Sequence, residues 1–270
     1  MKRSRNKTSI ISPGAIGVFD SGVGGLTVAR AIRRFLPAES ILYFGDTMHV
    51  PYGNKSPETI LRYSRDNTDF LVKCGVKMVV VACNTSTAVA LKDLQKEYSV
   101  PIVGVIEPGA SEAVRVSTRG RISVIGTFRT VSSGAYQRAI HLLDKNAKVA
   151  SRACPLLVPL IEEGFQDKAV IEGVLKNYLG KIVSGADTLV LGCTHYPLIK
   201  SRIQKLYPKL RLVDSADATA REVARLLGPR NATSSKTGKI AICTNDINEV
   251  FVSISKRLFP GESIRFAQVG

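Results

Sequence analysis

The sequence predicts an α/β fold with mostly parallel sheets, arranged as two halves that face each other. Short runs of apolar residues recur along the 270-residue chain and stay apolar throughout instead of alternating. Helical patterns fill the segments between these runs, and two of the runs end in a cysteine turn of the same plan. Continuous apolar runs are typical of parallel strands covered on both faces. Strands that alternate with helices indicate right-handed βαβ units.

The expected strands are apolar runs that end in small or polar residues. Their length of about four residues suits a buried strand and is too short for a buried helix. In chain order they are Ile16–Phe19, Ile41–Phe44, Met78–Val81, Ile102–Val105, Ile122–Ile125, Thr188–Leu191, Leu210–Val213 and Ile240–Ile242.

The expected helices carry start and stop signals. Leu26–Leu36 has apolar residues three and four positions apart, and Pro37 ends it. The next helix begins at Ser56-Pro57-Glu58, which combines a capping hydroxyl, a first-turn proline and an early acid. It runs to Cys74, where Gly75 supplies the stop. Similar signals predict helices over Thr87–Tyr98, Gly134–Leu143, Ala169–Val183, Leu198–Tyr207, Ala216–Leu227 and Asn248–Leu258.

The two cysteine turns repeat one plan. The segment 78–85 reads MVVVACNT and the segment 188–195 reads TLVLGCTH. In each, an apolar strand ends in a small residue, and a Cys, two polar residues and a helix follow. Cys83 and Cys193 lie 110 positions apart (193 − 83), which indicates two βα-layered halves that face each other.

Composition bounds the class of protein. The chain is 44% apolar and 22% charged, so it can bury a sizeable core as one large or two modest domains. Its formal net charge of +16 raises the question of a polyanionic partner. No apolar run reaches the length of a membrane-spanning helix, and the first 13 residues lack the apolar core of a signal peptide. We therefore interpret residues 1–13 as a short basic tail on a cytoplasmic protein.

The five cysteines are odd in number and form no Cys-x-x-Cys pair. This disfavours a disulfide scaffold and a zinc knuckle, and leaves the question of a reactive thiol. A Cys at a strand end with a helix behind it lies near the positive end of the helix dipole, which can lower the thiol pKa. Cys83 and Cys193 have this placement, and a small buried core residue is the alternative for each. The structural interpretation is favoured for Cys74, Cys154 and Cys243.

Two further turns follow expected strands, where ligands bind in open α/β sheets. The glycine-rich turn Asp20–Gly25 (DSGVGG) can present backbone N–H groups to an anion. It matches neither the Walker A nor the GxGxxG pattern, so a carboxylate is a better ligand than a nucleotide. The alternative is a tight turn with Asp20 as a helix cap. Gly45–Thr47 and Pro51–Gly53 are turn segments with polar tips, and a structural role is their first interpretation.

Two opposed thiols suit one kind of chemistry. A thiolate on one face of a tetrahedral carbon removes a proton while a thiol on the other face returns one, which inverts a stereocentre without a cofactor. Asp20 or Asp46 can orient a substrate ammonium group or adjust the thiol pKa values. His195, two residues from Cys193, can tune that thiol. Groups suited to holding a substrate carboxylate are Ser21, Asn84, Thr85 and Thr194.

Six motifs, in order over about residues 14–270, resemble those of the glutamate racemase family. They are FDSGVGGLTV (Phe19–Val28), GDTMHVPYG (Gly45–Gly53), VVACNTSTA (Val80–Ala88), GVIEPGA (Gly104–Ala110), CPLLVPLIEEG (Cys154–Gly164) and LGCTHYPL (Leu191–Leu198). The resemblance implies a two-base racemase that needs no cofactor or metal. Such an enzyme interconverts L- and D-glutamate and supplies D-glutamate for bacterial peptidoglycan.

The resemblance also implies residue roles. Cys83 would act on the α-proton of D-glutamate and Cys193 on that of L-glutamate. The assisting acid–base groups would be Asp20, Glu162 and His195, and Asp46 is a weaker candidate. The substrate pocket would be lined by Asp20, Ser21, Pro51, Tyr52, Gly53, Asn84, Thr85, Thr127, Thr194 and His195.

The implied fold has two pseudo-symmetric α/β lobes with the active site in the cleft between them. The first lobe would comprise residues 1–105 plus 213–270, and the second residues 106–212. Family members are commonly homodimers, so a homodimer is expected. Thr87 and Met48 differ from the residues that are usual at these motif positions. Both lie outside the proton-transfer residues, so the differences bear on the shape of the pocket and not on the mechanism.

Two alternatives remain open. A related cysteine-pair racemase or decarboxylase would act on aspartate, hydantoin or an arylmalonate-like acid, although Asn84–Thr85 and Thr194–His195 favour glutamate. A nucleic-acid-binding protein on this fold would use the positive charge, which is concentrated in Arg115–Arg152 and Lys200–Arg211. These basic residues lie at helical or loop spacing, so solvated faces are the favoured interpretation and neither nucleic acid nor a membrane is an expected partner.

Overall fold

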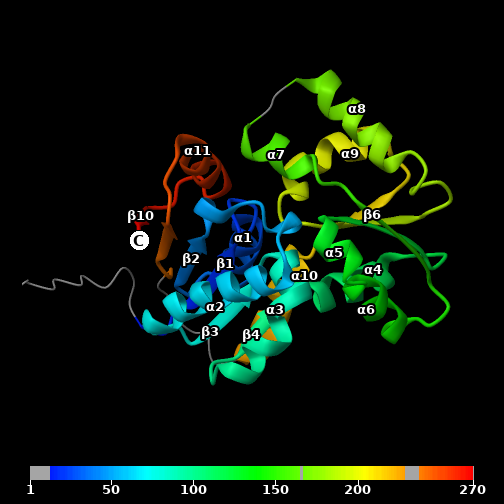
Figure 1. Cartoon of the computed structure of the whole chain (residues 1–270). Helices are drawn as coiled ribbons and strands as arrows, with labels where there is room; N and C mark the ends of the chain where they lie inside the picture. The colour runs from blue at the N-terminus through cyan, green and yellow to red at the C-terminus, as the bar shows by residue number, and fades with distance from the viewer. Residues whose placement is uncertain (1–12, 165–166, 229–236, 270) are drawn as a thin grey trace, which may run out of the picture.

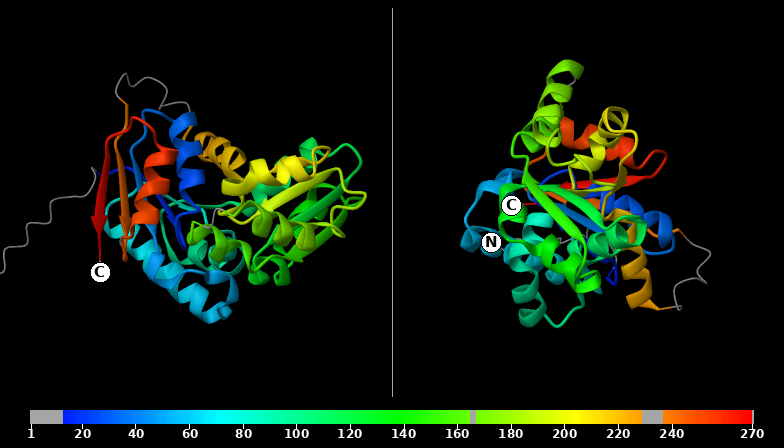
Figure 2. Two further views of the ribbon diagram at one scale, coloured as in Figure 1. Left: turned by 90° about the horizontal axis from the view of Figure 1, so that it is seen from above. Right: turned by 90° about the vertical axis from the view of Figure 1, so that its right-hand side faces the viewer.

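The computed structural model describes residues 13–164, 167–228 and 237–269. The expected basic tail, residues 1–13, lies outside the described residues except for Pro13. The described strands form two sheets, and every strand pair in both sheets is parallel. Figure 1 and the left view of Figure 2 show the sheets side by side, each flanked by helices. The predicted α/β fold with parallel sheets is confirmed.

The first sheet, sheet A, has six strands in the order β10-β9-β2-β1-β3-β4. Helices α1, α10 and α11 share one core with residues such as Val18 and Val80, whereas α2 and α3 share a second core with Phe19 and Val81. Both faces of the strands are therefore covered, which explains their continuously apolar sequences. The elements are β1 (Ile16–Asp20), β2 (Ile41–Gly45), β3 (Met78–Val81), β4 (Ile102–Gly104), β9 (Ile240–Thr244), β10 (Ile264–Gln268), α1 (Leu26–Phe35), α2 (Pro57–Lys73), α3 (Asn84–Glu97), α10 (Ala216–Leu227) and α11 (Glu249–Leu258).

The second sheet, sheet B, has four strands in the order β6-β5-β7-β8. Helices α4 and α6 share a core with Val124 and Val190 on one face, and α7, α8 and α9 share a core with Ile125 and Leu191 on the other. The elements are β5 (Arg121–Gly126), β6 (Lys148–Ala153), β7 (Thr188–Gly192), β8 (Arg211–Val213), α4 (Ile106–Val116), α5 (Phe128–Ser132), α6 (Ala135–Leu143), α7 (Leu157–Glu162), α8 (Lys168–Leu179) and α9 (Lys200–Leu206).

Two strands of the structure are absent from the sequence prediction. β6 and β10 lie at the edges of their sheets, and most of their side chains are at least partly exposed. Their sequences, KVASRA and IRFAQ, therefore carry charged and polar residues that the search for continuous apolar runs passes over. The eight expected strands all form, with ends that differ by up to two residues.

The helix predictions differ from the structure in several places. α3 begins at Asn84, three residues before the predicted Thr87, and α8 ends at Leu179, four residues before the predicted Val183. α4 is missing from the predictions because its first turn contains Pro108 and Gly109, which obscure the pattern. The segment expected as one helix, Leu198–Tyr207, begins instead as a 3₁₀ turn, η3 (Tyr196–Ile199), before α9. α5 and α7 are only five and six residues long and were not expected. Among the described residues, no helix is both long and apolar enough to cross a membrane.

The chain passes between the sheets at two places, from β4 into α4 and from β8 into α10. These two helices contact each other, so the two connections lie together, as Figure 1 shows. Sheet A draws its strands from residues 16–104 and 240–268, and sheet B from residues 121–213. The lobe boundaries at 105/106 and 212/213 stay a prediction. The two cysteine turns follow the carboxyl ends of β3 and β7 and lie close together.

Candidate active site

The two cysteine turns line one small cavity between the sheets. Cys83 comes from the end of β3 in sheet A, and Cys193 follows β7 in sheet B. Both side chains are buried. The full lining is Ser21, Pro51, Tyr52, Gly53, Cys83, Asn84, Thr85, Thr127, Val158, Cys193, Thr194 and His195.

Cys83 occupies the N-cap position of α3. Its Sγ accepts a hydrogen bond from the Ser86 N–H at 3.5 Å and donates one to Ser21 Oγ at 3.8 Å. A helix N-terminus does lie directly behind Cys83, although α3 begins at Asn84, three residues before the predicted Thr87. The expected lowering of the thiol pKa is wrong, however. Burial, followed by the negative charge of Asp20, outweighs the Ser86 and Ser21 hydrogen bonds and raises the pKa of Cys83 to about 11.

Cys193 has a different environment. It is followed by the 3₁₀ turn η3, whereas the α-helix α9 begins only at Lys200, so no α-helix N-terminus lies directly behind this thiol. This corrects the expectation of matching helix dipoles at the two cysteines. The nearest titratable group is His195, whose Nδ1 lies 3.7 Å from Cys193 Sγ. An imidazolium thus takes the place of a helix dipole as the local positive charge.

His195 and Glu162 form a buried ion pair. His195 Nε2 bonds to Glu162 Oε1, which also accepts the Val23 N–H at 3.4 Å. Burial by itself opposes the imidazolium, but the Glu162 charge and hydrogen bonds to Cys193 and Glu162 raise the pKa of His195 well above its usual range. Burial likewise opposes ionisation of Glu162, and the His195 charge prevails and lowers the Glu162 pKa. Both groups are therefore charged at neutral pH.

Asp20 is fully buried behind the cavity. Its Oδ2 accepts the N–H groups of Gly22 and Gly25 at 3.2 and 3.0 Å, and its Oδ1 accepts the Thr194 hydroxyl at 3.1 Å. The anion held by the glycine-rich turn is thus the chain's own carboxylate, which differs from the expected substrate anion. A Cβ on Gly25 would lie 2.4 Å from Asp20 Cβ, so only glycine fits there. Burial raises the pKa of Asp20, and the His195 charge opposes this rise.

Asp46 fastens the turn that carries Tyr52 and Gly53 into the cavity. Its buried carboxylate accepts hydrogen bonds from the Tyr52 hydroxyl, from the Asn245 amide and from His49 Nδ1, the last at 2.7 Å. We call these groups the Asp46 clamp. Gly53 lies so close to the turn after β5 of sheet B that a Cβ there would be 2.6 Å from Thr127 Cβ.

Hydroxyl and amide groups supply the polar wall of the cavity. Thr85 Oγ1 lies 2.9 Å from Thr127 Oγ1, and Thr127 Oγ1 lies 3.1 Å from Thr130 Oγ1. Asn84 Oδ1 accepts the Tyr136 hydroxyl at 2.7 Å, whereas the buried Asn84 Nδ2 has no hydrogen-bond partner. An unpartnered buried donor at a cavity wall is available to a ligand acceptor.

The structure brings all the predicted site residues together. Asp20 and Glu162 lie behind the cavity and contact Thr194 and His195, while the others line it directly. Sequence reasoning missed Val158 and Tyr136, because each lies in a helix where an apolar or aromatic residue indicates only core packing. The described residues contain no group of three or more His, Cys, Asp or Glu side chains that could hold a metal ion.

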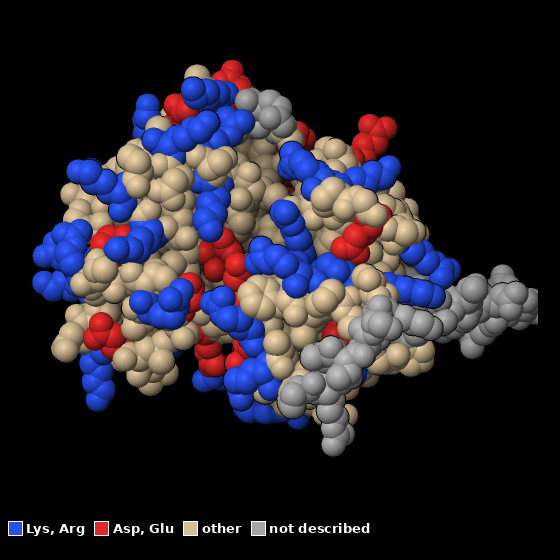
Figure 3. Space-filling view, turned by 180° about the vertical axis from the view of Figure 1, so that it is seen from behind, with Lys and Arg blue, Asp and Glu red and all other residues tan. Residues whose placement is uncertain are grey.

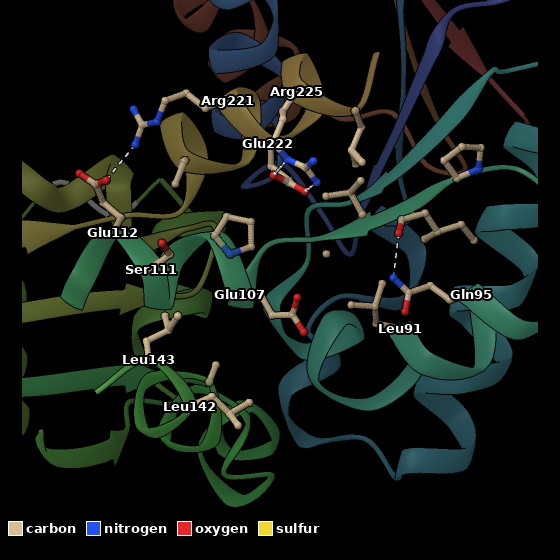
Figure 4. A pocket seen from close by; sticks show the side chains of 18 of the residues that line it. Leu91, Gln95, Glu107, Ser111, Glu112, Leu142, Leu143, Arg221, Glu222 and Arg225 are labelled. Atoms are coloured by element: carbon tan, nitrogen blue, oxygen red, sulfur yellow. Dashed lines mark hydrogen bonds and ion pairs between the residues drawn. The ribbon is translucent and has the colours of Figure 1, made fainter. Parts of the chain in front are cut away.

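A larger groove lies elsewhere, where α3 and β4 meet α4, α6 and α10. Its volume is about 1070 Å³, and Figure 4 shows the side chains that line it. They include three ion pairs, Glu112–Arg115, Glu112–Arg221 and Glu222–Arg225, and no cysteine. Since the reactive groups are all at the small cavity, that cavity is the candidate active site.

The sequence model of the family described as Asp/Glu/Hydantoin racemase matches residues 16–223. The glutamate racemase of Geobacter metallireducens is 49% identical over 252 residues, which cover 92% of this chain and 93% of the relative. A glutamate racemase isoform of Bacillus anthracis has a solved structure with a TM-score of 0.89 and 40% identity, covering 95% of this chain and 97% of that one. The Francisella tularensis glutamate racemase, solved with D-glutamate, gives 0.87 at 35% identity with the same coverage, 95% and 97%.

This chain therefore belongs to the Asp/Glu/hydantoin racemase family. The relatives named above are all glutamate racemases. The resemblance that the six motifs predict is confirmed.

Proposed function

We propose that this chain interconverts L- and D-glutamate by moving a proton at the α-carbon between Cys83 and Cys193. The observation that carries the proposal is the pair of thiols, one from each sheet, at one small cavity. The glutamate racemases to which the chain is similar support glutamate as the substrate. The proposed product, D-glutamate, serves peptidoglycan synthesis.

Each direction uses one thiolate and one thiol. In the D-to-L direction the Cys83 thiolate takes the α-proton, and the electron pair of the broken C–H bond stays on the α-carbon as a carbanion. The Cys193 thiol then delivers its proton to the opposite face. L-glutamate, a Cys83 thiol and a Cys193 thiolate result, and the reverse reaction exchanges the roles. No oxidant or cofactor enters this balance.

The two thiols lie in different surroundings. The Cys83 pKa of about 11 favours a protonated thiol. His195, held as a cation by Glu162, lies 3.7 Å from Cys193 Sγ.

The polar wall is suited to the substrate carboxylates. The carbanion formed at the α-carbon is stabilised when hydrogen-bond donors hold the adjacent carboxylate. Asn84 Nδ2 is the unpartnered donor among the lining residues, and the lining also holds the hydroxyls of Thr85 and Thr127 and that of Thr194, which donates to Asp20. Ser21 and the Pro51–Gly53 turn complete the proposed pocket. Asp20 acts through Cys83 and Thr194, and Glu162 acts through His195.

The proposed assembly is a homodimer in the cytoplasm, where thiols remain reduced. Each subunit would consist of the lobes 1–105 plus 213–270 and 106–212, with the cavity between them. Sedimentation velocity tests the dimer: the expected mass is twice the chain mass of 29.2 kDa, and a single species at that chain mass would contradict it.

Exchange of cysteine for serine tests the two-base mechanism. We expect Cys83→Ser and Cys193→Ser each to lower racemisation at least about 10²-fold, because serine is a far weaker acid–base group in this role. In D₂O, deuterium should enter mainly the inverted product. The matched control is Cys243→Ser, a buried thiol outside the cavity, which should retain activity. Full racemase activity in either active-site variant would refute the assignment.

The substrate is tested separately from the mechanism. L-glutamate and L-aspartate are offered to the wild-type chain without added pyridoxal phosphate or metal, and the products are separated by chiral chromatography. D-glutamate should form. If only D-aspartate forms, the two-thiol mechanism is kept, but the substrate is aspartate instead of glutamate.

A further inference from the structure

One aromatic side chain contacts both cysteine turns. Tyr136, the second residue of α6, is only 2% exposed. Its ring lies against Gly192, the residue before Cys193, where a Cβ would come within 3.0 Å of Tyr136 Cε2. Its hydroxyl donates to Oδ1 of Asn84, the residue after Cys83, at 2.7 Å. Tyr136 therefore spans from the end of β7 to the start of α3.

The space around the hydroxyl is shaped to receive it. A Cβ on Gly109 would lie 3.1 Å from Tyr136 Oη and 3.2 Å from Ser215 Cβ, so glycine there leaves room for the hydroxyl. Gly109 belongs to α4, and Ser215 precedes α10. The Tyr136 hydroxyl therefore lies against Gly109 of α4, in the segment where the chain first passes between the sheets.

The hydrogen bond to Asn84 Oδ1 determines where the rest of the amide points. A primary amide has one acceptor and one donor group. With Oδ1 engaged by Tyr136, the Nδ2 group is fixed as the donor that has no protein partner, and Asn84 lines the cavity with both thiols. Among the described residues, the other buried side-chain N and O atoms without partners belong to residues outside the lining of this cavity, namely Arg33, Ser64, Ser86 and Thr219.

We propose that Tyr136 is a positioning residue of the substrate site, which holds the Asn84 amide with its Nδ2 directed to a substrate carboxylate. This inference rests on the proposed function. Tyr136 does not touch the reacting atoms; it acts through Asn84 and through the backbone at Gly192. A substrate held by a freely rotating Asn84 amide would bind less tightly, because the amide would have to be ordered at each binding event.

The test is Tyr136→Phe, which removes the hydroxyl and keeps the ring against Gly192. The KM for both enantiomers should rise about fivefold to tenfold, as expected for loss of one organising hydrogen bond, with a smaller change in kcat. The matched control is Tyr98→Phe. Tyr98 is the C-cap residue of helix α3, at the opposite end from Asn84. Its hydroxyl also donates a hydrogen bond, to Asp69 at 2.7 Å. Its KM should stay at the wild-type value.

A double-mutant cycle separates positioning from a merely structural role. In an Asn84→Ala background, Tyr136→Phe should have no further effect on KM, because the amide it positions is gone. Additive KM effects, or a lowered melting temperature with unchanged KM, would overturn the proposal. A wild-type chain without glutamate turnover would overturn the proposed function as well, and an active wild type with an unchanged Tyr136→Phe would overturn only the inference.

Discussion

At the scale of single residues, the two thiols differ more than their matching sequences suggest. Cys83 has a helix N-terminus and a nearby carboxylate, whereas Cys193 has a histidine cation and only a 3₁₀ turn behind it. The negative charge of Asp20 works against the dipole of α3. The electrostatics of the site thus come from buried side chains distant in sequence as much as from the local turn.

Asp20→Asn tests this balance at Cys83. Removal of the carboxylate charge should lower the Cys83 pKa from about 11 towards its ordinary value, although burial continues to hold it up. The measurement is the pH dependence of iodoacetamide alkylation, followed by mass spectrometry of the peptide that contains Cys83. The Cys243 peptide serves as an internal control, since Asp20 is not among the causes of its raised pKa. An unchanged Cys83 profile would show that burial alone sets its pKa.

The His195–Glu162 pair predicts a pH dependence of stability. The raised His195 pKa contributes stability that is complete below its unfolded value of about 6.5 and is lost as pH rises through the folded value. The lowered Glu162 pKa contributes stability above about 4.3, which is lost as pH falls through its folded value. The difference in melting temperature between wild type and Glu162→Gln should be largest between these limits and shrink as pH rises.

The control for that measurement is Glu172→Gln, which removes a 3.8 Å ion pair with Lys168 on α8. Surface pairs of this kind contribute little, so its melting temperature should differ little from wild type at any pH. A Glu162→Gln difference that does not change from about pH 6 upward would contradict the assignment of a raised His195 pKa.

At the scale of elements, the Asp46 clamp connects sheet A to the cavity. Asn245, at the end of β9, reaches the carboxylate that also holds Tyr52, and its Oδ1 accepts the Met48 N–H at 2.9 Å. These hydrogen bonds hold the turn that carries Pro51, Tyr52 and Gly53 against the end of strand β9.

Asn245→Ala should loosen this turn. Loss of a donor to a buried carboxylate should lower the free energy of unfolding by about 1–3 kcal/mol and raise the KM for glutamate severalfold. The matched control is Asn248→Ala. Asn248 caps α11 by accepting the Phe251 N–H at 2.8 Å, and its loss should cost about 1 kcal/mol while KM stays unchanged. Equal KM effects in both variants would mean that Asn245 acts only through stability.

The elements also show what the sequence can and cannot reveal. Strands buried on both faces are visible as apolar runs, and their carboxyl ends locate both thiols. Two elements give no such pattern. The edge strand β6 is partly exposed and therefore carries charged and polar residues, and helix α4 has a proline in its first turn. The pKa of Cys83 depends on Asp20, which is distant in sequence, and Tyr136 resembles any core aromatic residue until its hydroxyl is seen beside Asn84.

At the scale of the whole molecule, the sequence has a net charge of +16, and the described part of the chain shows how its charged side chains are distributed. Figure 3 shows Lys and Arg side chains distributed over one face and interspersed with acidic and uncharged residues. Some basic residues of the charge-rich segments are paired: Arg115 contacts Glu112, and Lys200 contacts Asp214. This pattern is typical of solvated faces.

Duplex DNA tests the remaining charge hypothesis. At micromolar protein and about 0.15 M salt, where surface charges are screened within about 8 Å, we expect no shift in DNA mobility. Glutamate racemisation measured in the same buffer confirms that the protein is folded. A mobility shift that weakens with rising salt would revive the nucleic-acid hypothesis.

The placement of one thiol on each sheet has a thermodynamic consequence. Mirror-image substrates have equal free energies in water, so the equilibrium constant of the proposed reaction is fixed at unity. Under the Haldane relation, kcat/KM must then be the same for both enantiomers, whatever is changed in either lobe. The contrast between the helix terminus at Cys83 and the imidazolium at Cys193 cannot favour one hand of glutamate at equilibrium. It can make kcat and KM differ between the two enantiomers only by the same factor.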